Sequence, residues 1–301
     1  MPTAGHPTRL SEAARELGLE PYILDLEVNG LTIVPPEVHG VAEDRFDLML
    51  DLVLKRAEEL VGCPFSLDRG PHAELDFSPN PGSLIGYTGD ENVPTQFLLQ
   101  TLGRVHRVFR DVAVNPVAVA FMRHMIGGNN ARFSSHNSFV KWHGGRGYGP
   151  TLGLHADQGR SPLPWGRNAL NGNTNWCLTD YTREGGALAY VPGSHRRVTR
   201  PVQAQDEAVP AECPKGSLIV WHGATWHGAF PRMIPGMRVS VTNYYRHRMV
   251  TSQEDIRATF PRELAEDCDD PALFRLLAGF EDRGPYVEQS YPIPRARRSD
   301  G

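Results

Sequence analysis

The chain has 301 residues, enough for one large domain or two small ones with a sizeable core. Lys and Arg number 31 against 35 Asp and Glu, so the net charge of −4 offers no basic footprint for a nucleic acid. No apolar run is as long as a membrane span, and residues 1–9 lack the apolar stretch of a secretory signal. We therefore expect a cytoplasmic protein with no membrane or nucleic-acid partner.

The four cysteines are far apart and form no Cys-x-x-Cys pair, which argues against a zinc knuckle or a disulfide framework. We expect them to be reduced and structural; they are Cys63, Cys177, Cys213 and Cys268. The 30 glycines and 25 prolines favour short strands and turns over a helical bundle. No repeat or composition shift divides the chain, so we expect one domain over 1–301 with flexible ends at 1–10 and 292–301.

Helical patterns dominate the first 130 residues. A short helix capped by Ser11 is predicted over 10–19. Residues 23–34 are predicted to form a bent strand or a strand pair, with Asn29-Gly30 as its turn. Apolar residues at helical spacing predict outer helices at 43–61, 94–112 and 115–125. The polar stretch 70–81 is predicted to be a loop and is a candidate lid.

From residue 131 the pattern changes to short runs rich in β-branched and aromatic residues, which is typical of a sandwich or barrel. The predicted strands are 131–142, 150–156, 173–180, 187–191, 217–221, 226–230 and 237–246. Helical patterns return at 252–264 and 271–278. The sequence thus predicts a β core followed by closing helices.

A histidine and a carboxylate lie two residues apart in Leu154-His155-Ala156-Asp157-Gln158. Alternate residues of a strand point the same way, so His155 and Asp157 would share one face. They supply two ligands of a 2-His-1-carboxylate iron site, and a distant histidine must supply the third. The candidate is His227, seventy residues after Asp157. The alternative is a surface His-Asp pair and an unrelated core histidine.

Arg238 follows His227 by eleven residues. Together with the run Gly-Ala-Leu-x-x-Val-Pro-Gly-Ser-His at 186–195, these residues resemble the phytanoyl-CoA dioxygenase (PhyH) family of iron(II)- and 2-oxoglutarate-dependent oxygenases. The resemblance covers about 130–247, and more loosely 29–35. It implies a double-stranded β-helix, a jelly roll of cupin type, as an all-β core over 131–247 with N- and C-terminal helices packed outside, an α+β architecture.

The resemblance also implies the cofactors iron(II), 2-oxoglutarate and O2. It places iron on His155, Asp157 and His227, and it places Arg238 on the distal carboxylate of 2-oxoglutarate. A guanidinium offers two parallel N–H donors that match a carboxylate. Further candidates for the cosubstrate site are Ser240, Asn175 and Lys141. His222 also lies near His227 along the chain, but the His-Gly dipeptide and the spacing to the arginine select His227.

The substrate pocket is assigned to the insert that follows Asp157 and to neighbouring aromatic residues. Its candidate residues are Gln158, Trp165, Arg167 and Trp226, although a core position is the default for a tryptophan and solvent exposure for a loop arginine. We expect hydroxylation of a small or medium natural-product-like molecule with release of succinate and CO2, by a monomer or homodimer. The alternatives are desaturation, epoxidation or rearrangement by the same oxygenase, a metal-binding regulatory module, and a cupin-like metal enzyme that needs no 2-oxo acid.

Overall fold

The computed structural model describes residues 11–76, 96–143, 152–166, 168–202 and 204–282. Its α-helices are α1 (Glu12–Glu16), α2 (Glu20–Asn29), α3 (Pro36–His39), α4 (Glu43–Val61), α5 (Arg107–Ala113), α6 (Pro116–Ile126), α7 (Ile256–Thr259), α8 (Arg262–Ala265) and α9 (Pro271–Ala278). Its strands are β1 (Leu31–Val34), β2 (Phe65–Ser66), β3 (Gly70–Pro71), β4 (Gln96–Leu99), β5 (Ala131–Trp142), β6 (Asn171–Cys177), β7 (Leu188–Tyr190), β8 (Val209–Pro210), β9 (Leu218–His222), β10 (His227–Ala229) and β11 (Met237–His247). None of the helices in these ranges combines the length and apolarity needed to cross a bilayer.

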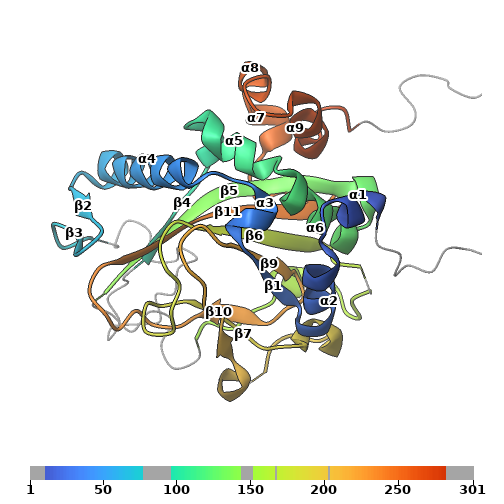
Figure 1. The fold of residues 1–301 in the computed structure, drawn as a ribbon, viewed down its shortest axis with the longest axis horizontal. Coiled ribbons are helices and arrows are strands. Elements are labelled where there is room, and N and C mark those ends of the chain that lie inside the picture. The colour runs from blue at the N-terminus through green and yellow to red at the C-terminus, as the bar shows by residue number, and fades with distance from the viewer. Residues whose placement is uncertain (1–10, 77–95, 144–151, 167, 203, 283–301) are drawn as a thin grey trace, which may run out of the picture.

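The largest element is a six-stranded antiparallel sheet in the order β1-β9-β6-β11-β5-β4 (Figure 1). Its longest pairing joins β5 and β11, from Met237 opposite Trp142 to His247 opposite Ala131, with an irregularity at Tyr244/Tyr245. Nearly every residue of these two strands is buried, because each strand is covered on both faces. The architecture is therefore α+β around a large antiparallel sheet.

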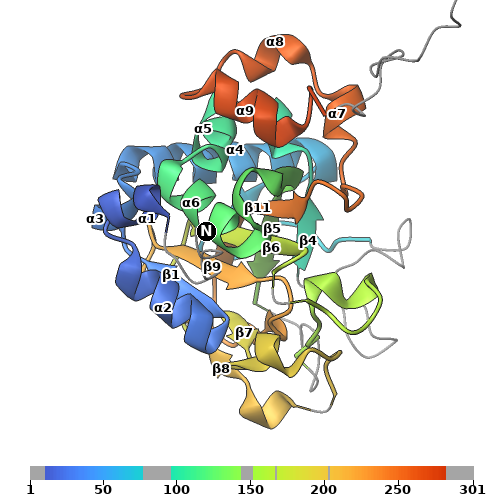
Figure 2. The ribbon, with the colours of Figure 1, turned by 90° about the vertical axis from the view of Figure 1, so that its right-hand side faces the viewer.

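A second sheet contains three short strands in the order β10-β7-β8. Figures 1 and 2 show this small sheet on the opposite side of the large sheet from α4, α5 and α6. A hairpin of β2 and β3 follows α4. The large sheet thus separates a helical layer from the small sheet.

The helical layer is held by apolar stripes that face the large sheet. In α4 the buried residues are Phe46, Met49, Leu50, Val53 and Ala57. α6 is capped by Asn115, whose Oδ1 accepts hydrogen bonds from the N–H groups of Val117 and Ala118. Val239 and Val241 of β11 belong to the same core, so the residues that alternate with them along the strand face the small sheet. This alternation directs Arg238 and Ser240 away from the helices.

The prediction for 23–34 was wrong over its first half. Residues 20–29 form α2, and only Leu31–Val34 is a strand. Gly30, with φ +80°, ends the helix instead of turning a hairpin. A glycine in this left-handed conformation serves both purposes equally well, so the local sequence does not distinguish them.

Two further predictions were wrong in part. Within 94–112 the helix spans only Arg107–Ala113, because Gln96–Leu99 pair with the edge of β5 as β4. The predicted helix at 252–264 is divided into α7 and α8, with Pro261 between them. The helices over 43–61 and 271–278 and the strand over 131–142 match the predicted bounds.

The strand expected at 150–156 is not formed in its described part. Leu152 and Gly153 form a turn with φ +55° and +63°, and only His155 makes a β-bridge. Residues 150 and 151 lie outside the described residues. The candidate lid at 70–81 is described only to residue 76, and its first two residues form β3.

Candidate metal centre

The three predicted ligands lie on two adjoining backbone segments. His155 and His227 exchange both backbone N–H···O bonds at 2.8 Å, which fixes the segment around His155 against β10. Ala156 is extended, with φ −116° and ψ 133°, and Asp157 begins a 3-10 helix. A single extended residue therefore directs both His155 and Asp157 toward His227, where a full strand had been expected.

The ligand atoms of these three residues all lie within 4.8 Å of one another. His155 Nε2 lies 3.8 Å from Asp157 Oδ1, and His227 Nε2 lies 3.6 Å from Asp157 Oδ2. In the described ranges this is the cluster of His, Cys, Asp and Glu side chains that can hold a metal ion. Two imidazoles and one carboxylate are the donor set of non-haem iron sites.

Backbone carbonyls fix both imidazole tautomers. His155 Nδ1 lies 2.8 Å from the carbonyl oxygen of Gly153, and His227 Nδ1 lies 2.9 Å from that of Thr225. A carbonyl only accepts, so each Nδ1 carries the proton and each Nε2 keeps its lone pair. Such hydrogen bonds to the second ring nitrogen are typical of histidine ligands.

Asp157 is positioned by two donors from the large sheet. Asn173 Nδ2 on β6 and Trp221 Nε1 on β9 donate to Asp157 Oδ2 at 2.6 and 3.2 Å. Asn173 and Trp221 are also Cα partners in the β6–β9 pairing. The side chain of Asp157 is only 15% exposed, so these bonds compensate the removal of its carboxylate from water.

Burial lowers the pKa of His227 to about 4, although the nearby Asp157 carboxylate opposes the shift. His227 is 5% exposed. Its ring is therefore neutral at neutral pH, which is the form that binds a metal.

Gly228 permits the close approach of the two ligand segments. A Cβ atom at this position would lie 2.0 Å from the carbonyl oxygen of Leu152. That carbonyl accepts a hydrogen bond from the N–H of Ala229 at 3.0 Å. The His-Gly dipeptide thus combines a ligand with the room that the other ligand segment needs.

Arg238 lies on the face of β11 that points toward the small sheet, and it is 5% exposed. Its Nη1 donates to the phenol oxygen of Tyr181 at 3.2 Å, and its guanidinium carbon lies 5.0 Å from the centre of the Tyr181 ring. The Ser240 hydroxyl faces the same phenol. The structure thus brings Arg238 and Ser240 together and adds Tyr181, which the sequence analysis did not select.

Asn175 and Lys141 join this group. Asn175 Nδ2 donates to Tyr181 Oη at 3.1 Å, and Asn175 Oδ1 accepts from Thr242 Oγ1 at 3.0 Å. Lys141 is Arg238's partner in the β5–β11 pairing and donates from Nζ to the carbonyl of Phe230 at 2.5 Å. Burial, and then the neighbouring guanidinium groups of Arg238 and Arg232, hold the pKa of Lys141 well below its ordinary value.

The candidate pocket residues have different surroundings. Gln158 is buried, and its Oε1 accepts from the N–H of Leu170 at 3.2 Å. Trp165 and Trp226 belong to one small hydrophobic cluster with Leu152 and Ala156, beside the ligand segments. Their role in a substrate pocket stays a prediction, and Arg167 lies outside the described residues.

His222, the alternative third ligand, is separate from the cluster. Its Nδ1 accepts from the N–H of Ala224 at 3.0 Å, and its ring centre lies 5.3 Å from that of His195. Asn173 and Trp221, which hold the Asp157 carboxylate, were not predicted from the sequence. Asn173 was detectable in principle, because it shares a strand face with Asn175.

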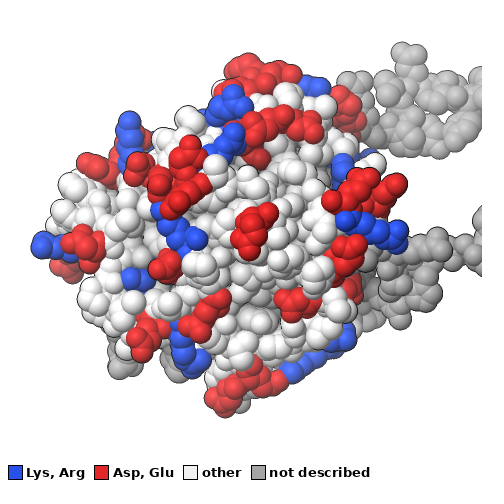
Figure 3. Space-filling view, viewed as in Figure 1, with Lys and Arg blue, Asp and Glu red and all other residues white. Residues whose placement is uncertain are grey.

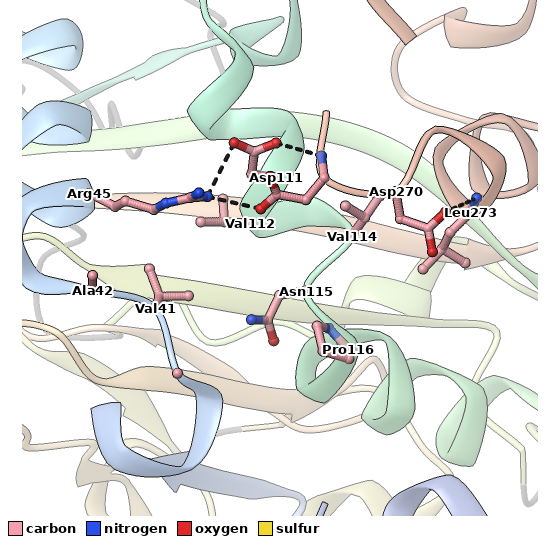
Figure 4. A pocket seen from close by; sticks show the side chains of 12 residues that line it. Val41, Ala42, Arg45, Asp111, Val112, Val114, Asn115, Pro116, Asp270 and Leu273 are labelled. Atoms are coloured by element: carbon pink, nitrogen blue, oxygen red, sulfur yellow. Dashed lines mark hydrogen bonds and ion pairs between the residues drawn. The ribbon is translucent and has the colours of Figure 1, made fainter. Parts of the chain in front are cut away.

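A cavity of about 510 Å³ opens elsewhere, between the α3–α4 connection, α5, α6 and α9. Figure 4 shows that Arg45 reaches across it to Asp111. Asn115, at its floor, is engaged by the N-terminal N–H groups of α6 and by the carbonyl of His39. These polar side chains are therefore bonded within the protein, and the cavity contains no member of the metal cluster.

Figure 3 shows one face of the described surface, on which acidic and basic side chains are interspersed. Neither sign forms a continuous band on this face. Among the described residues, oppositely charged side chains pair at the surface, as Lys215 does with Asp47 and Arg197 with Glu207.

The sequence matches the model of the phytanoyl-CoA dioxygenase (PhyH) family over residues 77–240, more than half of the chain. Dioxygenase af480 of Aspergillus fumigatus is 31% identical over 195 residues, which cover 61% of each chain. Dioxygenase aneA of Aspergillus aculeatus is 30% identical over 125 residues, 38% of this chain and 40% of the relative. The chain thus spans about three fifths or less of the length of these relatives.

Solved structures with a similar fold include non-haem 2-oxoglutarate-dependent enzymes. The carbocyclase SnoK from nogalamycin biosynthesis has a TM-score of 0.53 at 16% identity, over 76% of this chain and 83% of that chain. The epimerase SnoN, in complex with Fe3+, α-ketoglutarate and nogalamycin RO, has a TM-score of 0.53 at 16% identity, over 77% and 84% of the two chains. HygX from Streptomyces hygroscopicus, with nickel and 2-oxoglutarate bound, has a TM-score of 0.51 at 12% identity, over 77% and 88%.

The family match and the fold point the same way as the order of motifs in the sequence. The match includes His155, Asp157, His227 and Arg238. The chain belongs to the phytanoyl-CoA dioxygenase family of iron(II)- and 2-oxoglutarate-dependent oxygenases.

Proposed function

We propose that the protein is an iron(II)- and 2-oxoglutarate-dependent dioxygenase that hydroxylates an unactivated C–H bond of a small or medium natural-product-like molecule. The observation that carries this proposal is the cluster of His155, Asp157 and His227, with all ligand atoms within 4.8 Å. The iron and the 2-oxo acid would supply oxidation by O2 with release of succinate and CO2. The protein's own residues would bind and orient the cosubstrate and the substrate, and would exclude water from them.

The donor set fits iron(II) without rearrangement of the tautomers. Both histidines present an unprotonated Nε2 toward Asp157, because backbone carbonyls hold their Nδ1 protons. With three protein donors, a bound iron would keep room for the cosubstrate and for O2. Trp221 and Asn173 hold the Asp157 carboxylate, so this negatively charged ligand is already in position before a metal ion binds.

The buried cations on the face of β11 that points toward the small sheet suit a dicarboxylate. Arg238 would bind the distal carboxylate of 2-oxoglutarate through its fork of N–H donors, with Ser240 and Tyr181 as neighbouring hydroxyl groups. Burial, and then repulsion by Arg238 and Arg232, lowers the pKa of Lys141, so a bound anion at this position would stabilise all three cations. Asn175 would hold the Tyr181 phenol in place.

We further infer that the large and small sheets are the two halves of a jelly roll, with the metal at its mouth in a single domain. Gln158, Trp165, Arg167 and Trp226 would border the substrate on the side of the 159–173 insert. Af480 and aneA are named dioxygenases, and SnoK and SnoN are described as enzymes from nogalamycin biosynthesis, which supports a natural-product-like substrate. The names carbocyclase and epimerase keep rearrangement, desaturation and epoxidation as alternative outcomes at the same site.

The experiment is an anaerobic titration of the iron(II)-loaded protein with 2-oxoglutarate, followed by its visible absorption. Chelation of the iron(II) by 2-oxoglutarate should give a weak metal-to-ligand charge-transfer band. Added O2 should then yield succinate even without substrate. Arg238→Ala should raise the concentration of 2-oxoglutarate needed for half the band by at least tenfold. Arg56→Ala, which removes an exposed arginine on α4, is the matched control.

The same titration separates the alternatives. A metal-binding module gives no succinate, and a cupin-like enzyme that needs no 2-oxo acid gives no band. Either result would overturn the proposal. The identity of the product, once a substrate is found by screening, distinguishes hydroxylation from the other oxidative outcomes.

A further inference from the structure

Two thiols lie in contact although the sequence separates them by 36 residues. Cys177 Sγ and Cys213 Sγ are 3.6 Å apart. Cys177 ends β6 and is fully buried, whereas Cys213 is half-buried and precedes the turn that leads to β9. Cys213 and Tyr181 exchange both backbone N–H···O bonds at 2.9 Å, which keeps the Cys213 segment against the strand end.

We propose that Cys177 and Cys213 form a redox-sensitive modification site that closes to a disulfide when the protein meets hydrogen peroxide. A disulfide holds its sulfurs about 2.05 Å apart, so the two atoms must approach by roughly 1.6 Å. The movement falls mainly to Cys213, which is half-buried, because Cys177 is fully buried at the end of β6. Neither the metal cluster nor the family match assigns a role to these thiols.

The accessible thiol reacts first. Cys213 attacks one oxygen of hydrogen peroxide, the O–O bond breaks, and a sulfenic acid and water form. Cys177 then attacks the oxidised sulfur, the S–O bond breaks, and a second water leaves with the two thiol protons accounted for. The net change is oxidation of two thiols and two-electron reduction of one peroxide. Burial, and then contact with Cys213, raise the pKa of Cys177, which leaves Cys213 as the initial nucleophile.

The pair is connected to the residues around Arg238. Cys177 is the Cα partner of Ser240, and Asn175 Nδ2 lies 3.5 Å from Cys177 Sγ. The same amide nitrogen donates to Tyr181, which in turn accepts from Arg238. Closing the disulfide draws Cys177 away from Asn175 and pulls on the backbone of Tyr181. We expect this movement to weaken 2-oxoglutarate binding, an expectation that rests on the proposed function.

The experiment treats the nickel(II)-loaded full chain with a small excess of hydrogen peroxide, removes the peroxide with catalase, and alkylates the remaining thiols. Peptide mapping by mass spectrometry should then show two peptides joined by a disulfide between Cys177 and Cys213, and dithiothreitol should separate them. Cys213→Ser should lose this peptide, whereas Cys63→Ser should keep it. Free alkylated Cys177 and Cys213, or a link that involves another cysteine, would overturn the proposal.

The second measurement is calorimetric titration with 2-oxoglutarate before and after oxidation. We expect the Kd to rise at least tenfold on oxidation and to recover with dithiothreitol, in wild type and Cys63→Ser but not in Cys213→Ser. An unchanged Kd in the linked protein would overturn the coupling to Arg238. A reduced protein that does not bind 2-oxoglutarate at all would count against the proposed function, while the peptide map decides the thiol pair independently.

Discussion

Asn173 Nδ2 donates a hydrogen bond of 2.6 Å to Asp157 Oδ2, and so ties the carboxylate of the metal cluster to the centre of the large sheet. Trp221 Nε1 donates to the same oxygen at 3.2 Å. Asp157 Oδ1 instead faces His155 Nε2 at 3.8 Å. One carboxylate oxygen is therefore committed to the scaffold, and the orientation of the other follows from it.

Removing the Asn173 amide should weaken metal binding without removing a ligand. We expect Asn173→Ala to lower nickel(II) affinity by roughly 10- to 100-fold, because the carboxylate loses its shortest orienting bond. Calorimetric titration with nickel(II) measures the change. Trp221→Phe, which keeps the ring but loses the longer bond, should cost less. Equal affinity in wild type and Asn173→Ala would contradict this account.

The space beside Gly228 should be as necessary as a ligand. In Gly228→Ala the new methyl group meets the Leu152 carbonyl at 2.0 Å, so the segment that carries His155 must move away from β10. We expect nickel(II) affinity to fall more than tenfold. Gly159→Ala is the control, since a Cβ there meets nothing within 4 Å. Retained affinity in Gly228→Ala would show that the segments tolerate separation.

Tyr181 should contribute to cosubstrate binding through Arg238. Tyr181→Phe removes the oxygen that accepts from Arg238 and Asn175, so both donors lose their fixed direction. We expect the Kd for 2-oxoglutarate to rise about three- to tenfold, which corresponds to roughly one ordinary hydrogen bond. Titration of the nickel(II)-loaded protein measures it. A rise as large as that of Arg238→Ala would instead mean that Tyr181 contacts the cosubstrate itself.

Local sequence was sufficient where one element contains its own signals. The helix over 43–61 combines an apolar stripe with a terminal glycine, and the strand over 131–142 is a continuous buried run; both have the predicted bounds. β4 was missed because its four residues become a strand only beside the free edge of β5. Tertiary pairing decided that segment against its helical pattern.

The site shows the same division. His155, Asp157 and His227 were selected because chemistry and spacing identify them along the chain. Tyr181 and Asn173 act only through contacts between strands, and nothing in their local sequence indicates which atoms they meet. The thiol pair was likewise hidden, since a 36-residue separation becomes a 3.6 Å contact only after folding.

His136 should make stability depend on pH. It is fully buried, burial lowers its pKa from 6.5 to about 3, and neither ring nitrogen has a hydrogen-bond partner in the described part of the chain. In the unfolded chain His136 therefore binds a proton below about pH 6.5, whereas in the folded protein it binds this proton only near pH 3. The free energy of unfolding therefore decreases as the pH is lowered through this window, by about 1.4 kcal/mol per pH unit. At pH 5 the loss relative to neutral pH is about 2 kcal/mol.

Urea unfolding at pH 7 and pH 5 tests this expectation. His136→Leu should lose less stability than wild type on acidification, whatever its stability at pH 7. His143→Leu, at an exposed position, should follow the wild-type pH dependence. An equal loss in wild type and His136→Leu would show that another group titrates in this window.

The ion pairs at the cavity of Figure 4 should hold the C-terminal segment to the helical layer. The buried Asp111 carboxylate accepts from Arg45, from Arg107 and from the N–H of Asp269. We expect Asp111→Asn to lower the free energy of unfolding by about 2–4 kcal/mol, because it removes the charge between two guanidinium groups. Urea unfolding measures it. Glu59→Gln, in an exposed pair with Arg56, should cost less than about 0.5 kcal/mol.

The hydrophobic residues fall into separate clusters, and the one that packs the helices on the large sheet includes neither Trp165 nor Trp226. What keeps the chain folded is thus largely distinct from what surrounds the metal ligands. Substitutions beside the ligands change the packing of the small cluster that contains Trp165 and Trp226, and do not change the large cluster between the helices and the sheet. We therefore expect such substitutions to change the surroundings of the candidate ligands more than the stability of the fold.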